Sequence, residues 1–208
     1  PPSRKLFLKV VVIGDSDIGK TALLERYIKK RFTGTYKATI GADFLCRDVR
    51  LGDTVVTMQV WDTAGQERYQ SLNCTYYRGA DACVLVFDKT NPASFEKLAY
   101  WRAEFLLQGD PADPDTFPFL VVGNKCDLES KYVVPSDTAR RWCEANNITC
   151  KYFDTSARDD VNVAEAFREV AVVAARRAAR SERFVHSPTT VALTAPPPTT
   201  KKSQSDCC

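Results

Sequence analysis

The chain has 208 residues, a formal net charge of +3, 44% hydrophobic residues and 26% charged residues. This length fits one ordinary domain with a buried core and a tail, and the small, dispersed charge argues against a nucleic-acid surface. The eight cysteines lack the paired spacing of a zinc site, so we expect reduced thiols. No apolar run approaches the roughly 18 residues of a membrane span, and we expect neither a transmembrane helix nor a signal peptide.

Short β-rich runs alternate with longer helical stretches, a pattern that predicts a parallel α/β sheet. Several runs are apolar at successive positions, as expected for strands covered by helices on both faces. We expect six strands, one of them antiparallel because Leu51-Gly52-Asp53 is typical of a hairpin turn. The predicted strands are 6–13, 43–50, 55–61, 82–88, 117–123 and 151–155, and the predicted helices are 20–30, 93–108, 136–146 and 162–180.

The composition changes after residue 180 to Ser, Thr, Pro and Ala, including Pro196-Pro197-Pro198. We therefore expect a folded domain over 1–180 and a flexible tail over 181–208. The tail holds the only histidine, His186, so we expect no histidine general base.

The first motif, Gly14-Asp15-Ser16-Asp17-Ile18-Gly19-Lys20-Thr21, follows a predicted strand and opens a predicted helix. Backbone N–H groups of such a loop wrap phosphates, and the positive end of the helix dipole points at them. We expect Lys20 to neutralise phosphate oxygens and the Thr21 hydroxyl to bind magnesium. The predicted phosphate-binding residues are Ser16, Asp17, Ile18, Gly19, Lys20, Thr21 and Ala22.

A second motif, Trp61-Asp62-Thr63-Ala64-Gly65-Gln66-Glu67, ends another predicted strand. Ligands gather at the carboxyl ends of parallel strands. We expect Asp62 to contact magnesium through water, Gly65 to bring its N–H to the terminal phosphate, and Gln66 to orient an attacking water. The alternative, a solvated acidic turn, is disfavoured by the first motif.

The third motif, Asn124-Lys125-Cys126-Asp127, follows a further apolar strand. Guanine presents N1–H and an exocyclic amine on one edge, so Asp127 can accept two hydrogen bonds that adenine does not offer in that arrangement. The sequence therefore predicts a GTP binder, and an ATP-dependent P-loop enzyme is the disfavoured alternative. Ser156-Ala157-Arg158 is expected to supply a backbone N–H to the guanine carbonyl oxygen, although such a tripeptide alone is also compatible with a helix cap.

These motifs, in this order, resemble the Ras-like small GTPases over residues 6–180, and within them the Rab proteins. The resemblance implies the P-loop GTPase fold, an α/β fold with a six-stranded, mostly parallel sheet and helices on both faces. Ala42 and the flanking Tyr36-Lys37-Ala38-Thr39 are most similar to the late-endosomal branch. The Rab-like stretches are Ile40-Gly41-Ala42-Asp43-Phe44, Gln66-Glu67-Arg68-Tyr69, Tyr76-Tyr77-Arg78-Gly79-Ala80, Leu85-Val86-Phe87-Asp88 and the terminal Cys207-Cys208.

The resemblance implies a switch that binds GTP or GDP with Mg²⁺, hydrolyses GTP slowly alone, and recruits effectors in the GTP state to regulate transport and fusion of late endosomes and lysosomes. Two switch segments would span 33–43 and 62–78. Thr39 would bind magnesium and the γ-phosphate, Tyr36 would cover the nucleotide, and catalysis would rest on Gln66, Lys20 and Thr39. The implied effector surface is Ile40, Phe44, Trp61 and Tyr76, although its aromatic members are equally typical of core packing.

The implied partners are effectors, a GTPase-activating protein, an exchange factor, Rab escort protein and GDP-dissociation inhibitor, with a monomeric chain and no nucleic acid. Cys207 and Cys208 would carry prenyl groups, because two lipid chains anchor a protein stably where one does not. The implied location is the cytoplasmic face of late-endosome and lysosome membranes, with cycling through the cytosol.

Two residues depart from the Rab pattern. Asp17 stands where the family usually carries glycine, and a carboxylate beside phosphates predicts faster nucleotide release, unless the side chain turns into water. Arg158 replaces the usual lysine, and its aliphatic stem can still pack over the base. The alternative functions are a GTP-binding scaffold with altered exchange or hydrolysis, and a Rab of another endosomal step.

Overall fold

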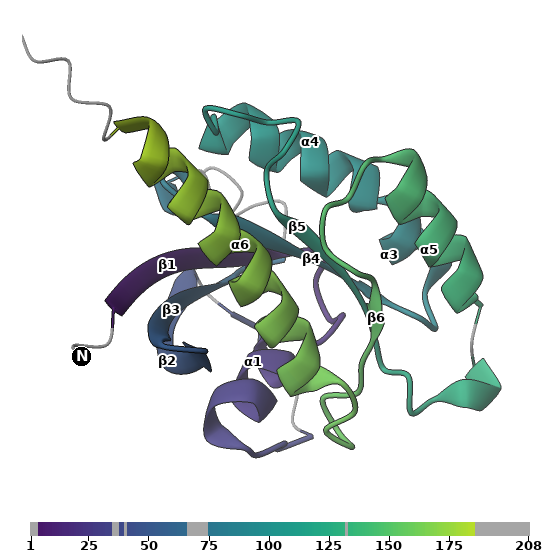
Figure 1. The fold of residues 1–208 in the computed structure, drawn as a ribbon. Coiled ribbons are helices and arrows are strands. Elements are labelled where there is room, and N and C mark those ends of the chain that lie inside the picture. Colours follow the sequence, from purple (N-terminus) through teal and green to yellow (C-terminus); the bar gives the residue numbers. More distant parts are fainter. Residues whose placement is uncertain (1–3, 35–37, 40, 66–74, 132, 186–208) are drawn as a thin grey trace, which may run out of the picture.

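A single sheet forms the centre of the computed structural model, which describes residues 4–34, 38–39, 41–65, 75–131 and 133–185. The sheet has six strands in the order β2-β3-β1-β4-β5-β6 (Figure 1). β2 runs antiparallel to β3, and the other neighbouring strands are parallel, which confirms the predicted sheet. The strands are β1 (Arg4–Ile13), β2 (Ala42–Leu51), β3 (Thr54–Thr63), β4 (Ala82–Asp88), β5 (Phe119–Asn124) and β6 (Phe153–Asp154).

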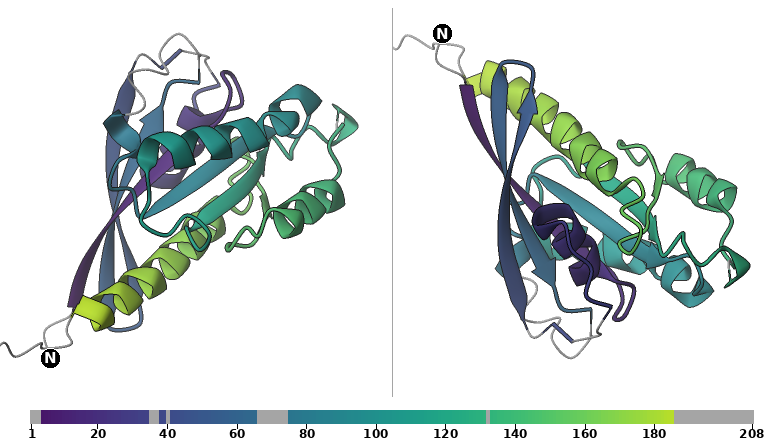
Figure 2. Two further views of the ribbon diagram at one scale, coloured as in Figure 1. Left: turned by 90° about the horizontal axis from the view of Figure 1, so that it is seen from above. Right: turned by 90° about the horizontal axis from the view of Figure 1, so that it is seen from below.

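Helices cover both faces of the sheet (Figure 2). One face carries α1 (Lys20–Lys29) and α6 (Val163–Val185), and the other carries α3 (Pro92–Glu96), α4 (Leu98–Gly109) and α5 (Ser136–Ala145). A short 3₁₀ turn, η2 (Glu129–Lys131), follows β5. Among the helices of the described residues, none has the length and apolar character needed to cross a bilayer.

The apolar runs of the central strands divide their side chains between two cores. In β4, Val84 and Val86 lie in the core under α1 and α6, whereas Leu85 and Phe87 lie in the core under α4 and α5. Every residue of β4 and β5 is buried. This two-sided burial explains why these strands are apolar at successive positions instead of alternating with polar residues.

Some boundaries differ from the sequence expectation. The single helix expected over 93–108 is two helices that meet at Lys97, and the first of them is capped by the Asn91 side chain on Ala93 N at 3.1 Å. β5 begins at Phe119 instead of residue 117, in keeping with Pro118, which has no N–H to donate to a ladder. α6 continues to Val185, past the expected end at residue 180.

The carboxyl ends of the parallel strands meet at one edge of the sheet. The loop after β1 leads into α1, β3 ends at Thr63, and β5 ends at Asn124. All three predicted motifs therefore converge at this edge, where ligands of open α/β sheets bind.

Candidate functional site

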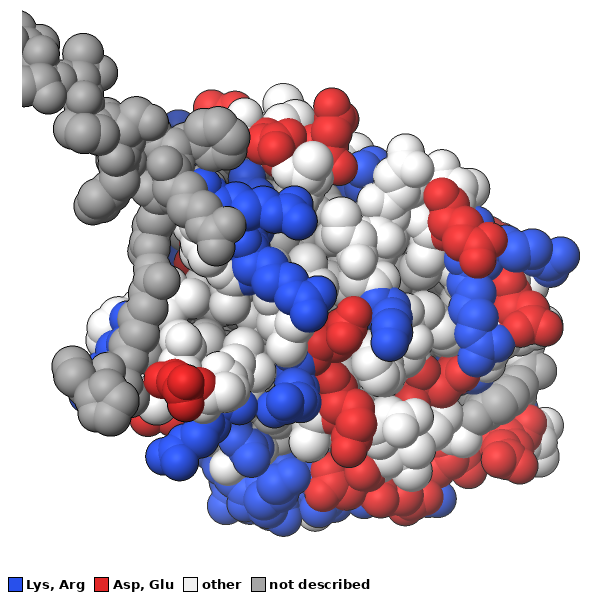
Figure 3. Space-filling model, in the orientation of Figure 1, with Lys and Arg blue, Asp and Glu red and all other residues white. Residues whose placement is uncertain are grey.

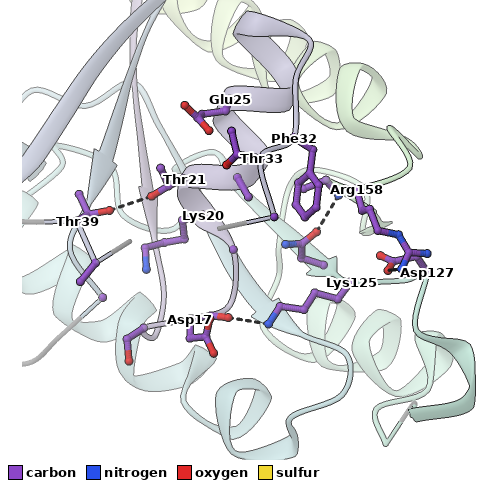
Figure 4. Close-up of a pocket in the computed structure, with 18 of the residues that line it drawn as sticks. Asp17, Lys20, Thr21, Glu25, Phe32, Thr33, Thr39, Lys125, Asp127 and Arg158 are labelled. Atoms are coloured by element: carbon purple, nitrogen blue, oxygen red, sulfur yellow. Dashed lines mark hydrogen bonds and ion pairs between the residues drawn. The ribbon is translucent and has the colours of Figure 1, made fainter. Parts of the chain in front are cut away.

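A cavity of about 960 Å³ lies at this edge of the sheet (Figure 4). Its volume falls at the upper end of the range of roughly 300–1,000 Å³ that is common for small-molecule sites. Its walls come from the loop after β1, the start of α1, the segment before β2, and the loops after β3, β5 and β6. The lining residues are Ser16, Asp17, Gly19, Lys20, Thr21, Ala22, Glu25, Phe32, Thr33, Gly34, Ala38, Thr39, Asp43, Gly65, Asn124, Lys125, Asp127, Leu128, Ala157 and Arg158.

The Lys20 ammonium is held inside the loop between β1 and α1. Its Nζ donates hydrogen bonds to the carbonyl oxygens of Gly14 at 2.8 Å and Asp15 at 2.7 Å. Lys20 is only 6% exposed, and burial lowers its pKa to about 8, although Asp62 and Asp15 oppose the shift. A buried cation in a loop of backbone N–H groups is suited to phosphate.

Two glycines let the backbone of neighbouring loops approach closely. Gly19 has a φ of 90°, and a Cβ at this position would collide with the Asn124 amide. A Cβ at Gly65 would collide with the Asp15 carbonyl and the Lys20 Nζ. The loop after β3 therefore touches the phosphate loop at Gly65, as the predicted role of this glycine requires.

A cluster of oxygen atoms lies beside Lys20. Thr21 Oγ1 donates to Asp62 Oδ2 at 2.5 Å and lies 2.9 Å from Thr39 Oγ1. Asp62 is 1% exposed, and within the described part of the chain its Oδ1 has no hydrogen-bond partner. Burial raises the pKa of Asp62 to about 6, against the opposing hydrogen bond from Thr21 and the charge of Lys20. A buried carboxylate oxygen without a donor, next to two hydroxyls, fits a hard cation that prefers oxygen ligands.

The motif after β5 joins the loops on either side of it. Asn124 Nδ2 donates to the Ile18 carbonyl at 2.9 Å, and Lys125 Nζ donates to the Asp17 carbonyl at 2.7 Å. Lys125 Nζ also pairs with Asp88 Oδ2 at 2.8 Å. The phosphate loop and the end of β5 therefore form one rigid wall of the cavity.

The Asp127 carboxylate is 7% exposed and has partners on both oxygens. Ser156 Oγ donates to Oδ1 at 2.7 Å, and Arg158 Nη1 pairs with Oδ2 at 3.1 Å. The Ala157 N–H makes a long hydrogen bond of 3.4 Å to Asn124 Oδ1. The loop after β6 thus holds Asp127 at the cavity wall, at the opposite end from Thr39 and the rest of the oxygen cluster (Figure 4).

Most of the predicted nucleotide-binding residues line this cavity, but three lie behind its wall. Ile18 is buried in the core and reaches the site through its carbonyl, and Ser156 is fully buried and acts on Asp127. The N–H of Ser156 bonds to the Val161 carbonyl at 3.2 Å instead of facing a base, and Asp62 is the third buried residue. Tyr36, Ile40, Gln66, Cys207 and Cys208 lie outside the described residues.

The sequence motifs missed several lining residues. Phe32 is 39% exposed and faces the cavity, and Glu25 and Asp43 add two carboxylates to its wall. An aromatic residue shortly after the first helix was the only available signal for Phe32, because no motif fixes its spacing.

Three aromatic residues of the predicted effector surface contact one another, and the fourth member, Ile40, lies outside the described residues. Trp61 stacks on Tyr76 with ring centroids 5.3 Å apart and lies 5.0 Å from the Phe44 ring. Phe44 is 44% exposed, whereas Trp61 and Tyr76 are partly buried. Elsewhere, on the face that carries α6, basic and acidic side chains lie beside one another (Figure 3).

Comparison with known proteins identifies the family of the chain. The model of the Ras family matches residues 9–176. The chain is 50% identical to Ras-related protein Rab7 of Drosophila melanogaster over 190 residues, which is 91% of each chain. It is 52% identical to Ras-related protein Rab-7a of Dictyostelium discoideum over 81% of this chain and 82% of the relative. It is 46% identical to Ras-related protein Rab-7b of Paramecium octaurelia over 99% and 98% of the two chains. The chain therefore belongs to the Ras family as a Rab7-like small GTPase, a guanine-nucleotide switch of late endosomal traffic that hydrolyses GTP.

Proposed function

We propose that the cavity holds GTP or GDP with one Mg²⁺, and that Thr39 engages the metal only while the γ-phosphate is present. The observation that supports this most is the cluster of Thr21, Thr39 and Asp62, with its unpartnered buried oxygen. Within the described ranges, no group of three or more His, Cys, Asp or Glu side chains is arranged to hold a metal alone. A site with one carboxylate and two hydroxyls suits Mg²⁺ completed by phosphate oxygens and water.

Thr21 and Thr39 would hold Mg²⁺ beside the buried Asp62 carboxylate, and the ion would supply positive charge that stabilises the developing negative charge during hydrolysis. Lys20 would exchange its two carbonyl contacts for oxygens of the β- and γ-phosphates. Gly65 would approach the γ-phosphate through its N–H, and Gln66 would orient the attacking water. Catalysis by such a site is positioning and charge stabilisation, so hydrolysis is slow until an activating protein adds its own groups.

The switch follows from the place of Thr39 in the chain. Thr39 precedes β2, whose Phe44 belongs to the aromatic surface with Trp61 and Tyr76. Loss of the γ-phosphate removes a contact that orders this segment, and the surface for effectors, which includes Ile40, changes with it. Tyr36 would cover the nucleotide in the same segment.

The other end of the cavity would hold the base. Asp127 would accept the guanine N1–H and amine, and the loop of Ser156, Ala157 and Arg158 would support it. Asn124 and Lys125 would fix the wall between base and phosphates, because both already bond to the phosphate loop.

Single-turnover GTP hydrolysis with Mg²⁺ tests the switch. We expect Thr39→Ala to slow hydrolysis about tenfold or more while changing GDP affinity less than about twofold. Thr21→Ala should weaken the binding of both GTP and GDP, because the Thr21 hydroxyl would bind the metal in the GTP state and in the GDP state. Hydrolysis at the wild-type rate by Thr39→Ala would contradict the proposed clamp.

We further propose the cellular setting that membership of the Rab family supports. Residues 1–180 would act as the switch and residues 181–208 as a spacer, with prenyl groups on Cys207 and Cys208. Rab proteins in general meet effectors, activating proteins, exchange factors and GDP-dissociation inhibitor; here Rab escort protein would present the chain for prenylation. The monomer would then cycle between cytosol and the cytoplasmic face of late endosomes and lysosomes.

Membrane partitioning after incubation with prenyl donor, escort protein and transferase tests this setting. Replacing both terminal cysteines by serine should abolish partitioning, since the tail then carries no lipid chain. Unchanged membrane partitioning of this variant would contradict attachment through prenyl groups on Cys207 and Cys208.

A second candidate function has one specific observation in its favour. Asp17 has a φ of 60° within the phosphate loop, a conformation that is uncommon for a residue with a side chain, and this exposed residue lines the cavity. A scaffold that exchanges nucleotide rapidly is the function this feature would favour.

A further inference from the structure

Arg158 closes a ring of polar contacts around the Asp127 carboxylate. Its Nη1 pairs with Asp127 Oδ2 at 3.1 Å, and Ser156 Oγ donates to the other oxygen at 2.7 Å. The side chain of Asp127 is 7% exposed, whereas that of Arg158 is 49% exposed. Arg158 also lines the cavity, on the same side as Phe32 (Figure 4). A charged donor therefore occupies the carboxylate that would read the base.

A second carboxylate fixes the orientation of this guanidinium. Arg158 Nε and Nη2 donate to the two oxygens of Asp159 at 2.9 and 3.0 Å. The Asp159 N–H donates to Ser156 Oγ at 2.9 Å, which completes the ring. The hydrogen bond from Arg158 lowers the pKa of the Asp159 carboxyl. The planar fork of a guanidinium matches one carboxylate with two parallel N–H groups while a third N–H group reaches another carboxylate, a geometry that the compact ammonium of lysine does not reproduce.

We propose that Arg158 competes with the base for Asp127, and that the ion pair between the two side chains weakens nucleotide retention. This inference rests on the proposed role of Asp127 as guanine acceptor. Guanine needs both carboxylate oxygens, and Ser156 can remain on Oδ1 because an oxygen has two lone pairs. Arg158 must either leave Oδ2 or share it with the guanine amine. If Arg158 leaves, the free energy of the ion pair is lost; if it stays, Oδ2 divides its negative charge between a cation and the guanine amine, so base binding is weaker in both cases.

The size of the effect follows from the exposure of Arg158. Ion pairs with a half-exposed partner contribute little, and their usual range corresponds to about two- to fivefold in a binding constant. The competition therefore tunes retention and does not prevent binding. Screening by salt weakens such a pair, so the penalty should fall as ionic strength rises.

The test compares GDP affinity and release for wild type, Arg158→Met and Arg158→Lys, with a fluorescent GDP. Methionine keeps an unbranched apolar stem that can pack over the base but removes the charge. Arg140→Met is the matched control, since Arg140 is an exposed arginine paired with Asp137 on α5, outside the cavity. We expect Arg158→Met to bind GDP about two- to fivefold more tightly, Arg158→Lys to lie between it and wild type, and Arg140→Met to match wild type. The difference in GDP affinity between wild type and Arg158→Met should narrow as the salt concentration rises from about 0.05 M to about 0.5 M.

Binding of ADP distinguishes a failure of the proposed competition from a failure of the proposed base site. If wild type prefers GDP to ADP but Arg158→Met binds GDP no more tightly than wild type, the competition is overturned while the base site stands. If wild type does not distinguish GDP from ADP, the base site itself fails, and the competition fails with it. Tighter binding by Arg158→Met that is independent of salt would also overturn the ion-pair explanation.

Discussion

The indole Nε1 of Trp101 donates a hydrogen bond of 2.8 Å to Oδ1 of Asp15, which ties α4 to the phosphate loop. Lys97 adds an ion pair of 3.2 Å to the other oxygen of the same carboxylate. The backbone carbonyl of Asp15 accepts from Lys20. Asp15 thus connects the helix on one face of the sheet with the cation that would meet the phosphates.

Replacing Trp101 by phenylalanine keeps an aromatic ring in the core but removes the N–H donor. We expect a loss of about 1 kcal/mol in the free energy of unfolding and GDP release a few times faster, because Asp15 no longer fixes the loop. Thermal unfolding and release of fluorescent GDP measure the two effects. Leu107→Ala, at an exposed position of the same helix, should change neither. A lower free energy of unfolding without any change in GDP release would show that the bond serves stability alone.

Replacing Asp17 by glycine removes a carboxylate from the cavity and relieves a φ of 60°. We expect GDP release to slow by about tenfold, an effect of the size that one nearby like charge can produce. Asp17→Asn should retain most of this change, because asparagine tolerates the same φ without the charge. Asp110→Gly is the control for backbone strain, since Asp110 has a φ of 44° at the end of α4 and lies outside the cavity. Equal release rates for wild type and Asp17→Gly would refute the effect.

Replacing Asp127 by asparagine exchanges an acceptor oxygen for an N–H donor. GDP affinity should fall by about 100-fold or more, because the guanine N1–H and amine lose their charged acceptor. Xanthosine diphosphate should bind the variant relatively better, since xanthine carries a carbonyl where guanine carries the amine. Competition binding with GDP and xanthosine diphosphate measures this change in preference. Asp137→Asn, an exposed carboxylate on α5, should behave as wild type; an unchanged GDP affinity of Asp127→Asn would remove Asp127 from the base site.

The buried Lys89 pairs with the partly buried Asp154 behind the base loops. Lys89 is 1% exposed and also donates to Ser136 Oγ at 2.8 Å. Burial alone would raise the pKa of Asp154, but hydrogen bonds from Lys89, Ser136 and Tyr152 outweigh it and lower the pKa below the ordinary 3.8. Lys89→Met should cost about 3 kcal/mol of unfolding free energy near neutral pH.

The stability that Lys89→Met loses depends on pH in one direction. A depressed carboxyl pKa contributes stability above the unfolded pKa, and that stability is lost as pH falls through the lower folded pKa. The gap between wild type and Lys89→Met should therefore narrow as pH falls below about 4. Urea unfolding over a pH series measures it, with exposed Lys151→Met as control. A gap that is constant with pH would assign the loss to packing.

Local signals in the sequence were sufficient to predict the strands and the phosphate loop. Apolar runs such as those of β4 and β5 define buried strands, and the spacing around Lys20 defines the loop wherever it follows a strand. The bond between Trp101 and Asp15 spans 86 positions, and no local pattern encodes such a pair.

Other features depend on the packing of the whole domain. A lysine that follows a strand is usually exposed, yet Lys89 is buried because Asp154 and Ser136 arrive from distant elements. The ring around Asp127 likewise requires the loops after β5 and β6 to meet. Arg158 could be recognised from the sequence as unusual, but its partners could not.

The most direct test of the account is the rate of GDP release with Mg²⁺ and with EDTA, for wild type and Asp62→Asn. If Thr21 and Asp62 hold a metal on the phosphates, chelation should speed release from wild type by about tenfold or more, whereas Asp62→Asn should release quickly in both conditions. Wild-type release that EDTA leaves unchanged would contradict the central claim that this cluster binds Mg²⁺ with the nucleotide.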